Sequence, residues 1–132
     1  MTSADYMLIN ARRSKTACFC GDNIDDEYKI YKAIDDAVSQ EYDHFLFCAE
    51  KESGLDFAKQ VILRKKKQKG NNADKIILVA VVTDERHSDN KSEEFRNEYF
   101  KILAECDYFV ELKNNDFLSC EKFIITKSSK LI

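Results

Sequence analysis

The chain has 132 residues, of which 44% are hydrophobic and 34% are charged, and its net charge is −3. This length fits a single domain, and the composition excludes both an intrinsically disordered chain and a membrane-spanning one, because no apolar run approaches about 18 residues. A slightly acidic balance, without a signal-like segment near the start, predicts a cytoplasmic globular protein rather than a nucleic-acid binder, whose domains are usually strongly basic.

Residues 1–14 show no clear periodicity, so we expect a loosely ordered arm ahead of one domain that spans 15–132. In that domain, short apolar runs alternate with stretches whose apolar residues recur every three or four positions, which predicts strands alternating with helices. In chain order, we predict a strand at 16–21, a helix from Asp25 through Val38, a strand at 45–49, a helix at 55–67, a strand at 75–82, a helix from Ser92 through Leu103, a strand at 108–112, a helix at 119–127 and the start of a strand at 131–132.

The run Lys75–Val82 is the most apolar and β-branched segment of the chain, which is typical of a central strand covered on both faces. Strands that alternate with helices of ten or more residues predict a parallel sheet with helices on both faces. We therefore predict an α/β fold, a Rossmann-like three-layer sandwich with a mostly parallel sheet of about four to five strands. The final strand leaves an open sheet edge after Ile132, so we expect a homodimer.

The cysteines are odd in number and lie mostly inside or beside apolar runs, which favours buried reduced thiols over disulfides. They are Cys18, Cys20, Cys48, Cys106 and Cys120. Neither Cys18-Phe19-Cys20 nor the two histidines, His44 and His87, have further ligands at the spacing of a metal site, so we predict no metal and no other cofactor. We do not expect Cys20 to be a nucleophile, because Asp22 nearby would raise its pKa.

The cationic run Arg64–Lys67, with Lys69, lies at a predicted helix end. It fits a nucleic-acid or acidic-partner patch, or a solvated helix C-terminus, where cations are favoured by about 0.3–1 kcal/mol each. The acidic net charge favours the second interpretation.

Four segments resemble a known family. Lys15–Ile24 reads K-T-A-C-F-C-G-D-N-I, Phe47–Ala58 reads F-C-A-E-K-E-S-G-L-D-F-A, Glu98–Asp107 reads E-Y-F-K-I-L-A-E-C-D, and Cys120–Ile132 reads C-E-K-F-I-I-T-K-S-S-K-L-I. Over nearly its whole length the chain resembles the YpsA-like branch of the SLOG superfamily, the Rossmann-like group that contains DNA-processing protein A and the LOG phosphoribohydrolases. The resemblance implies a Rossmann-like fold and a nucleotide-related ligand.

The functional positions of that family differ in this chain. Asp22–Ile24 stand where the family has His-Arg-Pro, Glu50 stands where it has Gly, and Cys120–Lys122 stand where it has Arg-Asn-Arg. Phosphate loops need backbone N–H groups close to the phosphate oxygens and a positive potential. Carboxylates at Asp22, Glu50, Glu52 and Asp56 repel a phosphate instead. The resemblance therefore implies a degenerate member.

Sheets of this kind bind ligands at the carboxyl ends of their strands. We therefore expect a pocket that binds or senses a nucleotide-related ligand, weakly or no longer at all. The residues expected to line it are Gly21, Asp22, Asn23, Glu50, Ser53, Gly54 and Asp56, with Thr83 and Lys122 at the rim.

Three of these residues also have simpler interpretations. Gly21 and Gly54 fit a tight turn or close packing, and Asp56 fits the start of a helix. An alternative function is an N-glycosidase with Asp22 or Glu50 as acid or base, although the P-G-G-x-G-T-x-x-E segment of the phosphoribohydrolases is absent. A third is a non-catalytic interaction scaffold with a vestigial pocket.

Overall fold

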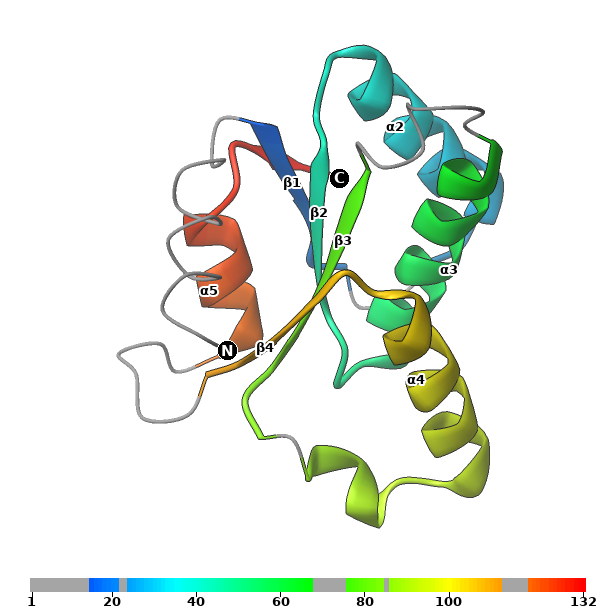
Figure 1. Ribbon diagram of the computed structural model, residues 1–132, viewed down its shortest axis with the longest axis vertical. Helices are drawn as coiled ribbons and strands as arrows, with labels where there is room; N and C mark the ends of the chain where they lie inside the picture. Colours follow the sequence, from blue (N-terminus) through cyan, green and yellow to red (C-terminus); the bar gives the residue numbers. More distant parts are fainter. Residues whose placement is uncertain (1–14, 22–23, 68–75, 85, 113–118) are drawn as a thin grey trace.

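The computed structural model describes residues 15–21, 24–67, 76–84, 86–112 and 119–132. In chain order, its elements are β1 (Thr16–Phe19), α2 (Glu27–Ser39), β2 (His44–Cys48), α3 (Glu52–Lys67), β3 (Ile77–Val82), the 3-10 helix η3 (His87–Asn90), α4 (Glu93–Glu105), β4 (Tyr108–Glu111), α5 (Cys120–Thr126) and β5 (Lys130–Leu131), as Figure 1 shows. The predicted strands and helices are all present. The arm predicted at 1–14 lies outside the described residues.

The strands form one five-stranded sheet in the order β4-β3-β2-β1-β5, and every neighbouring pair is parallel. β3 lies between two other strands and is buried along almost its whole length, which confirms its prediction as a central strand. β5 lies at one edge and pairs with β1 through two residues. The predicted homodimer stays a prediction.

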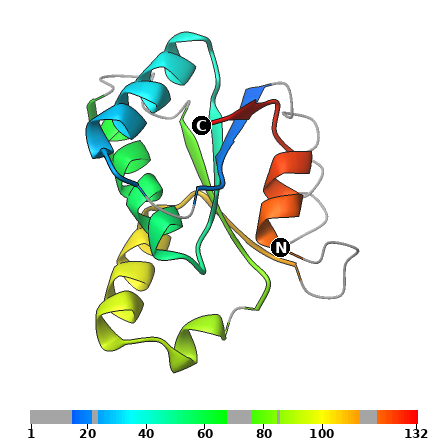
Figure 2. The ribbon, with the colours of Figure 1, turned by 180° about the vertical axis from the view of Figure 1, so that it is seen from behind.

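Helices cover both faces of the sheet, which confirms the three-layer fold. α2, α3 and α4 lie on one face and α5 lies on the other (Figures 1 and 2). From β1 to β4 the chain steps across the sheet in one direction, and right-handed crossovers then place the intervening helices on the same face. The connection from β4 to β5 returns to the other edge, so α5 lies on the opposite face.

Capping side chains set the starts of three helices. An Asp26 carboxylate oxygen accepts from the backbone N–H of Tyr28 at 3.0 Å, at the start of α2. Ser92 and Ser119 cap α4 and α5 in the same way. These residues satisfy N–H groups that have no partner inside the helix, so the sequence predicted these starts closely.

Two hydrophobic clusters hold the layers together. The larger one lies between the sheet and α2, α3 and α4, and includes the stacked rings of Phe19 and Phe57, whose centroids are 5.1 Å apart. The smaller one lies between the sheet and α5 and contains Cys18, Cys48 and Cys120. All five cysteines are free thiols, and these three are buried.

The cationic end of α3 interacts with neighbouring elements of the chain. Arg64 Nε donates to Asp35 Oδ1 at 2.6 Å, and Lys65 Nζ donates to Asp107 Oδ2 at 2.9 Å. These ion pairs join α3 to α2 and to the start of β4, which supports the interpretation of the run as a helix C-terminus. Among the helices that the structure describes, none is long and apolar enough to cross a bilayer.

Candidate functional site

A cavity of about 460 Å³ opens at the carboxyl ends of β2 and β3, beside the start of α5. It is lined by Cys48, Glu50, Lys51, Thr83, His87, Lys91 and residues 119–121. We call it the carboxyl-edge cavity. Its position follows the general rule that parallel α/β sheets bind ligands beyond the carboxyl ends of their strands.

Glu50 links the ends of two strands. Its Oε1 atom accepts hydrogen bonds from the Thr83 hydroxyl at 2.6 Å, from the Thr83 backbone N–H, and from the Asp84 backbone N–H at 3.4 Å. Backbone N–H groups after a strand are the donors that a phosphate loop offers to an anion. Here a carboxylate of the chain itself occupies that position.

His87 lies in η3 and packs edge-on against two aromatic rings of α4, with centroid distances of 4.6 Å to Tyr99 and 6.2 Å to Phe95. Both of its ring nitrogens are buried, and neither has a hydrogen-bond partner among the described residues. Burial lowers the pKa of His87, despite the opposing charge of Glu50. His87 as a whole is half-buried, because Tyr99 and Phe95 of α4 pack against its ring.

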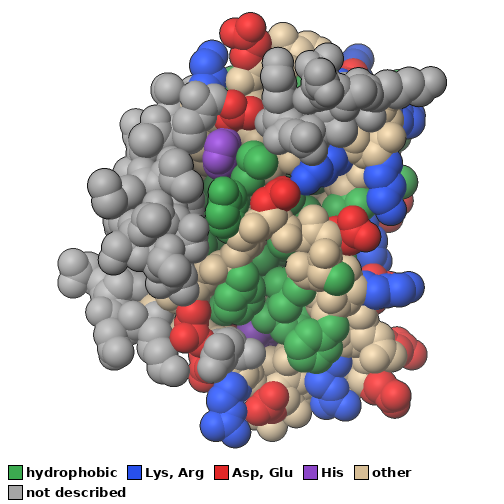
Figure 3. All heavy atoms as spheres, in the orientation of Figure 1, with side chains coloured by type: hydrophobic (Ala, Val, Ile, Leu, Met, Phe, Trp, Pro, Cys, Tyr) green, Lys and Arg blue, Asp and Glu red, His purple; other side chains and the backbone are tan. Residues whose placement is uncertain are grey.

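The surface near these aromatic side chains is partly apolar. Hydrophobic side chains reach the surface in the region between β4, η3 and α4 (Figure 3). Phe100, which contacts Tyr99, is 57% exposed. The ring of His87 thus packs against two aromatic rings of α4 and also lines the carboxyl-edge cavity.

Because the ring nitrogens of His87 are buried, the chain is expected to lose stability in mild acid. The pKa of His87 is lower in the folded chain than its ordinary value of 6.5, so only the unfolded chain takes up a proton as the pH first falls through that value. This stabilisation is fully present above the pKa that His87 has in the unfolded chain. It is lost as the pH falls toward the lower pKa that His87 has in the folded chain. Urea unfolding at about pH 7.5 and about pH 5.5 measures this loss.

His87→Phe is the matched variant, since it keeps a ring against Tyr99 but does not titrate. The wild-type chain should lose more unfolding free energy over this pH interval than the variant loses. An equal loss in the two proteins would contradict the assignment.

The ionised groups of the cavity balance one another. Lys51 forms an ion pair with Glu121, and Lys91 lies over the ring of Phe95, with its Nζ atom 5.5 Å from the centroid. Two cations, Lys51 and Lys91, thus face two carboxylates, Glu50 and Glu121. The cavity therefore has no excess positive charge with which to attract a phosphate.

Two buried thiols, Cys48 and Cys120, form part of the cavity wall. The Cys120 sulfur lies 3.5 Å from the Val81 carbonyl oxygen and 3.9 Å from Glu50 Oε1. Cys20 lies outside this lining, and its pKa is raised by a hydrogen bond to Cys18 and by burial. The direction agrees with the raised pKa predicted for Cys20, and the predicted cause, Asp22, lies outside the described residues.

The predicted site residues are only partly brought together. Glu50 and Thr83 line the cavity, whereas Ser53 and Gly54 pack inside the fold: the Ser53 hydroxyl donates to the Gly21 carbonyl at 2.8 Å. A Cβ atom at Gly54 would overlap the carbonyl oxygen of Cys48. Gly54 is therefore needed for the close approach of α3 to β2, which agrees with the interpretation of this glycine as a close-packing residue.

The remaining predicted residues lie elsewhere. Lys122 is exposed on α5, and its backbone N–H donates to the Ser119 hydroxyl at 3.2 Å. Asp22 and Asn23 are outside the described part of the chain. The predicted lining did not include Lys91 or residues 119–121, although Cys120 and Glu121 align with functional positions of the family. The sequence does not reveal that η3 and α5 flank the same strand ends.

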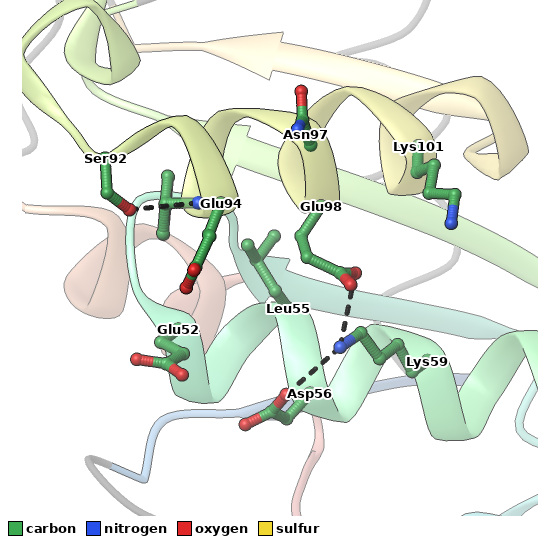
Figure 4. Close-up of a pocket in the computed structure, with 10 residues that line it drawn as sticks. Glu52, Leu55, Asp56, Lys59, Ser92, Glu94, Asn97, Glu98 and Lys101 are labelled. Atoms are coloured by element: carbon green, nitrogen blue, oxygen red, sulfur yellow. Dashed lines mark hydrogen bonds and ion pairs between the residues drawn. The ribbon is translucent and has the colours of Figure 1, made fainter.

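Asp56 lines a different hollow, a groove of about 840 Å³ between α3 and α4. Figure 4 shows Lys59 between Asp56 and Glu98, with its Nζ atom 3.6 Å and 3.2 Å from their carboxylate oxygens. Burial opposes the charge of Lys59, but the two carboxylates outweigh it and raise the pKa of Lys59. The groove is thus bridged by an ion-pair network that joins the two helices.

In the described segments, no group of three or more His, Cys, Asp and Glu side chains is arranged to hold a metal ion. No protein-family model matches the chain, and a comparison with curated proteins finds no match. Of what the family resemblance implies, the structure therefore shows only the α/β fold, with five parallel strands.

Proposed function

We propose that the chain is a binding or sensing module that takes an uncharged, nucleoside-type ligand in the carboxyl-edge cavity. The observation that carries this proposal is the imidazole of His87, whose buried nitrogens have no partner in the described part of the chain. A neutral imidazole offers one donor and one acceptor in diverging directions, so either nitrogen can pair with a complementary group of a nucleobase. Buried polar atoms without partners cost free energy, which such a ligand recovers.

The charge of the site supports an uncharged ligand rather than a phosphate. The strand-end donors of Thr83 and Asp84 are already bound to Glu50, and a phosphate in the cavity would meet the carboxylates of Glu50 and Glu121. A nucleoside avoids that repulsion and remains within the nucleotide-related class that the resemblance to the SLOG superfamily implies.

The geometry gives less support to an N-glycosidase. A general acid or base must exchange a proton with the substrate within hydrogen-bond reach. Glu50 Oε1 already accepts hydrogen bonds from the Thr83 hydroxyl and from two backbone N–H groups. We therefore propose binding without catalysis.

A thermal-shift experiment on the full chain tests the proposal, with the four common nucleosides and their 5′-monophosphates as probes at neutral pH. A ligand at 100 times its Kd stabilises the native state by about 2.7 kcal/mol, which for a chain of this size corresponds to a rise in Tm of roughly 10 °C. We expect at least one nucleoside to raise the Tm, and its monophosphate to raise it less.

The two histidines provide a matched pair of variants. His87→Phe removes both ring nitrogens and should abolish the nucleoside-induced shift. His44→Phe should keep it, because His44 is the first residue of β2, at the opposite end of the strand from the cavity. A flat response to every nucleoside at millimolar concentration, or an undiminished shift in His87→Phe, would contradict the proposal.

A further inference from the structure

Two thiols from distant parts of the sequence meet at the wall of the carboxyl-edge cavity. Cys48 is the last residue of β2 and Cys120 is the first residue of α5, and they are only 6% and 2% exposed. Both belong to the cluster between the sheet and α5, and the Cys120 sulfur lies 3.5 Å from the carbonyl oxygen of Val81, which is the sheet partner of Cys48. The cavity reaches both side chains although they are otherwise enclosed.

We propose that Cys48 and Cys120 are an oxidation site, at which a peroxide that enters the cavity converts the two thiols into a reversible disulfide. In the first step the Cys48 thiolate attacks a peroxide oxygen, the O–O bond breaks, and a sulfenic acid and one water are formed. In the second step the Cys120 thiol attacks the sulfenic sulfur and releases a second water. Overall, two thiols and one hydrogen peroxide give one disulfide and two waters, and two electrons pass from sulfur to oxygen.

The local interactions assign a different role to each sulfur. The hydrogen bond from Cys120 lowers the pKa of Cys48, although burial and the carboxylates of Glu121 and Glu50 oppose this effect. The same hydrogen bond, together with burial, raises the pKa of Cys120. The Cys120 thiol also donates to the Val81 carbonyl oxygen at 3.5 Å, which favours its protonated form. Because the thiolate is the nucleophile, Cys48 attacks the peroxide and Cys120 resolves the sulfenic acid.

The other cysteines are less suited to this reaction. Cys18 and Cys20 share a hydrogen bond, but they lie two residues apart in the same extended segment. Such a pair is separated by about 6.6 Å between Cα atoms, near the upper limit for a disulfide. Cys106 packs against the cluster on the other face of the sheet, and burial raises its pKa to about 12. It serves as the matched control.

Peptide mapping of the full-length chain tests the proposal. The reduced protein is treated with hydrogen peroxide, its remaining thiols are alkylated, and the digest is analysed by mass spectrometry. We expect a linked pair of peptides that contains Cys48 and Cys120, a mass about 2 Da lower than that of the two reduced peptides, and full reversal by dithiothreitol. The oxidised chain should also unfold at a Tm several degrees higher, since the bond constrains a long loop of the unfolded chain.

Two variants sharpen the result. Cys106→Ser should form the same linkage at the same rate as the wild-type chain. Cys120→Ser should leave Cys48 as a sulfenic acid that dimedone traps. Peroxide treatment of the wild-type chain that leaves both Cys48 and Cys120 open to alkylation after unfolding would overturn the proposal, and so would a linkage of Cys48 to Cys20. None of these readouts requires the nucleoside-type ligand, so this proposal and the proposed function fail separately.

Discussion

Gly54→Ala is expected to lower the free energy of unfolding by about 3 kcal/mol. A Cβ atom at this position would overlap the carbonyl oxygen of Cys48 and lie 3.0 Å from its carbonyl carbon. Both atoms belong to the backbone at the end of β2, so no side chain can rotate away. The first turn of α3 must shift instead, and Leu55 and Phe57 lose part of their packing. The higher helix propensity of alanine, worth about 1 kcal/mol, offsets only part of this loss.

Urea unfolding at neutral pH measures this effect, with Ser53→Ala as the neighbouring control. That control removes only the hydrogen bond from the Ser53 hydroxyl to the Gly21 carbonyl, which is 2.8 Å long, so it should cost about 1 kcal/mol. A Gly54→Ala chain that is as stable as the wild-type chain would contradict the close approach of α3 to β2.

Glu50→Ala is expected to lower the free energy of unfolding by about 2–3 kcal/mol, and Glu50→Gln by roughly half as much. The alanine variant leaves the backbone N–H and the hydroxyl of Thr83 without their acceptor at the ends of β2 and β3. Glutamine keeps an acceptor oxygen but loses the charge that strengthens these bonds. Glu52→Ala, at an exposed position two residues away, should change the stability by only about 0.5 kcal/mol.

The Glu50→Gln variant should also change the ligand preference. Glutamine still accepts from the N–H groups of Thr83 and Asp84, but the cavity loses one of the two negative charges that repel a phosphate. In the thermal-shift experiment, nucleoside monophosphates should therefore stabilise Glu50→Gln more than they stabilise the wild-type chain. If both proteins prefer the nucleoside to the same extent, Glu50 does not exclude phosphate.

The order and type of the elements were predictable because the signals for them are local. Asp26, Ser92 and Ser119 cap the helices that the sequence placed beside them. The prediction for α3 began three residues late, at Leu55 instead of Glu52, because its polar first turn shows no apolar periodicity. Backbone hydrogen bonds extend a helix residue by residue, so a helix can begin before the first residue of its buried face.

The candidate site was predictable only in part. Glu50 and Thr83 were found because strand ends meet at one edge of any parallel sheet. The spacing of Gly54 did not reveal whether its missing side chain makes room for a ligand or for the backbone of β2. His87 gave no signal in the sequence, since its burial depends on the aromatic rings of α4.

The sequence by itself determined an alternating α/β chain with a central apolar strand, because capping and periodicity act over a few residues. Tertiary structure decided which side chains share the carboxyl-edge cavity. The order β4-β3-β2-β1-β5 brings α5 back across the sheet, and with it Cys120 reaches Cys48. Such contacts depend on the order in which strands pair, and that order is a property of the whole chain rather than of any local segment.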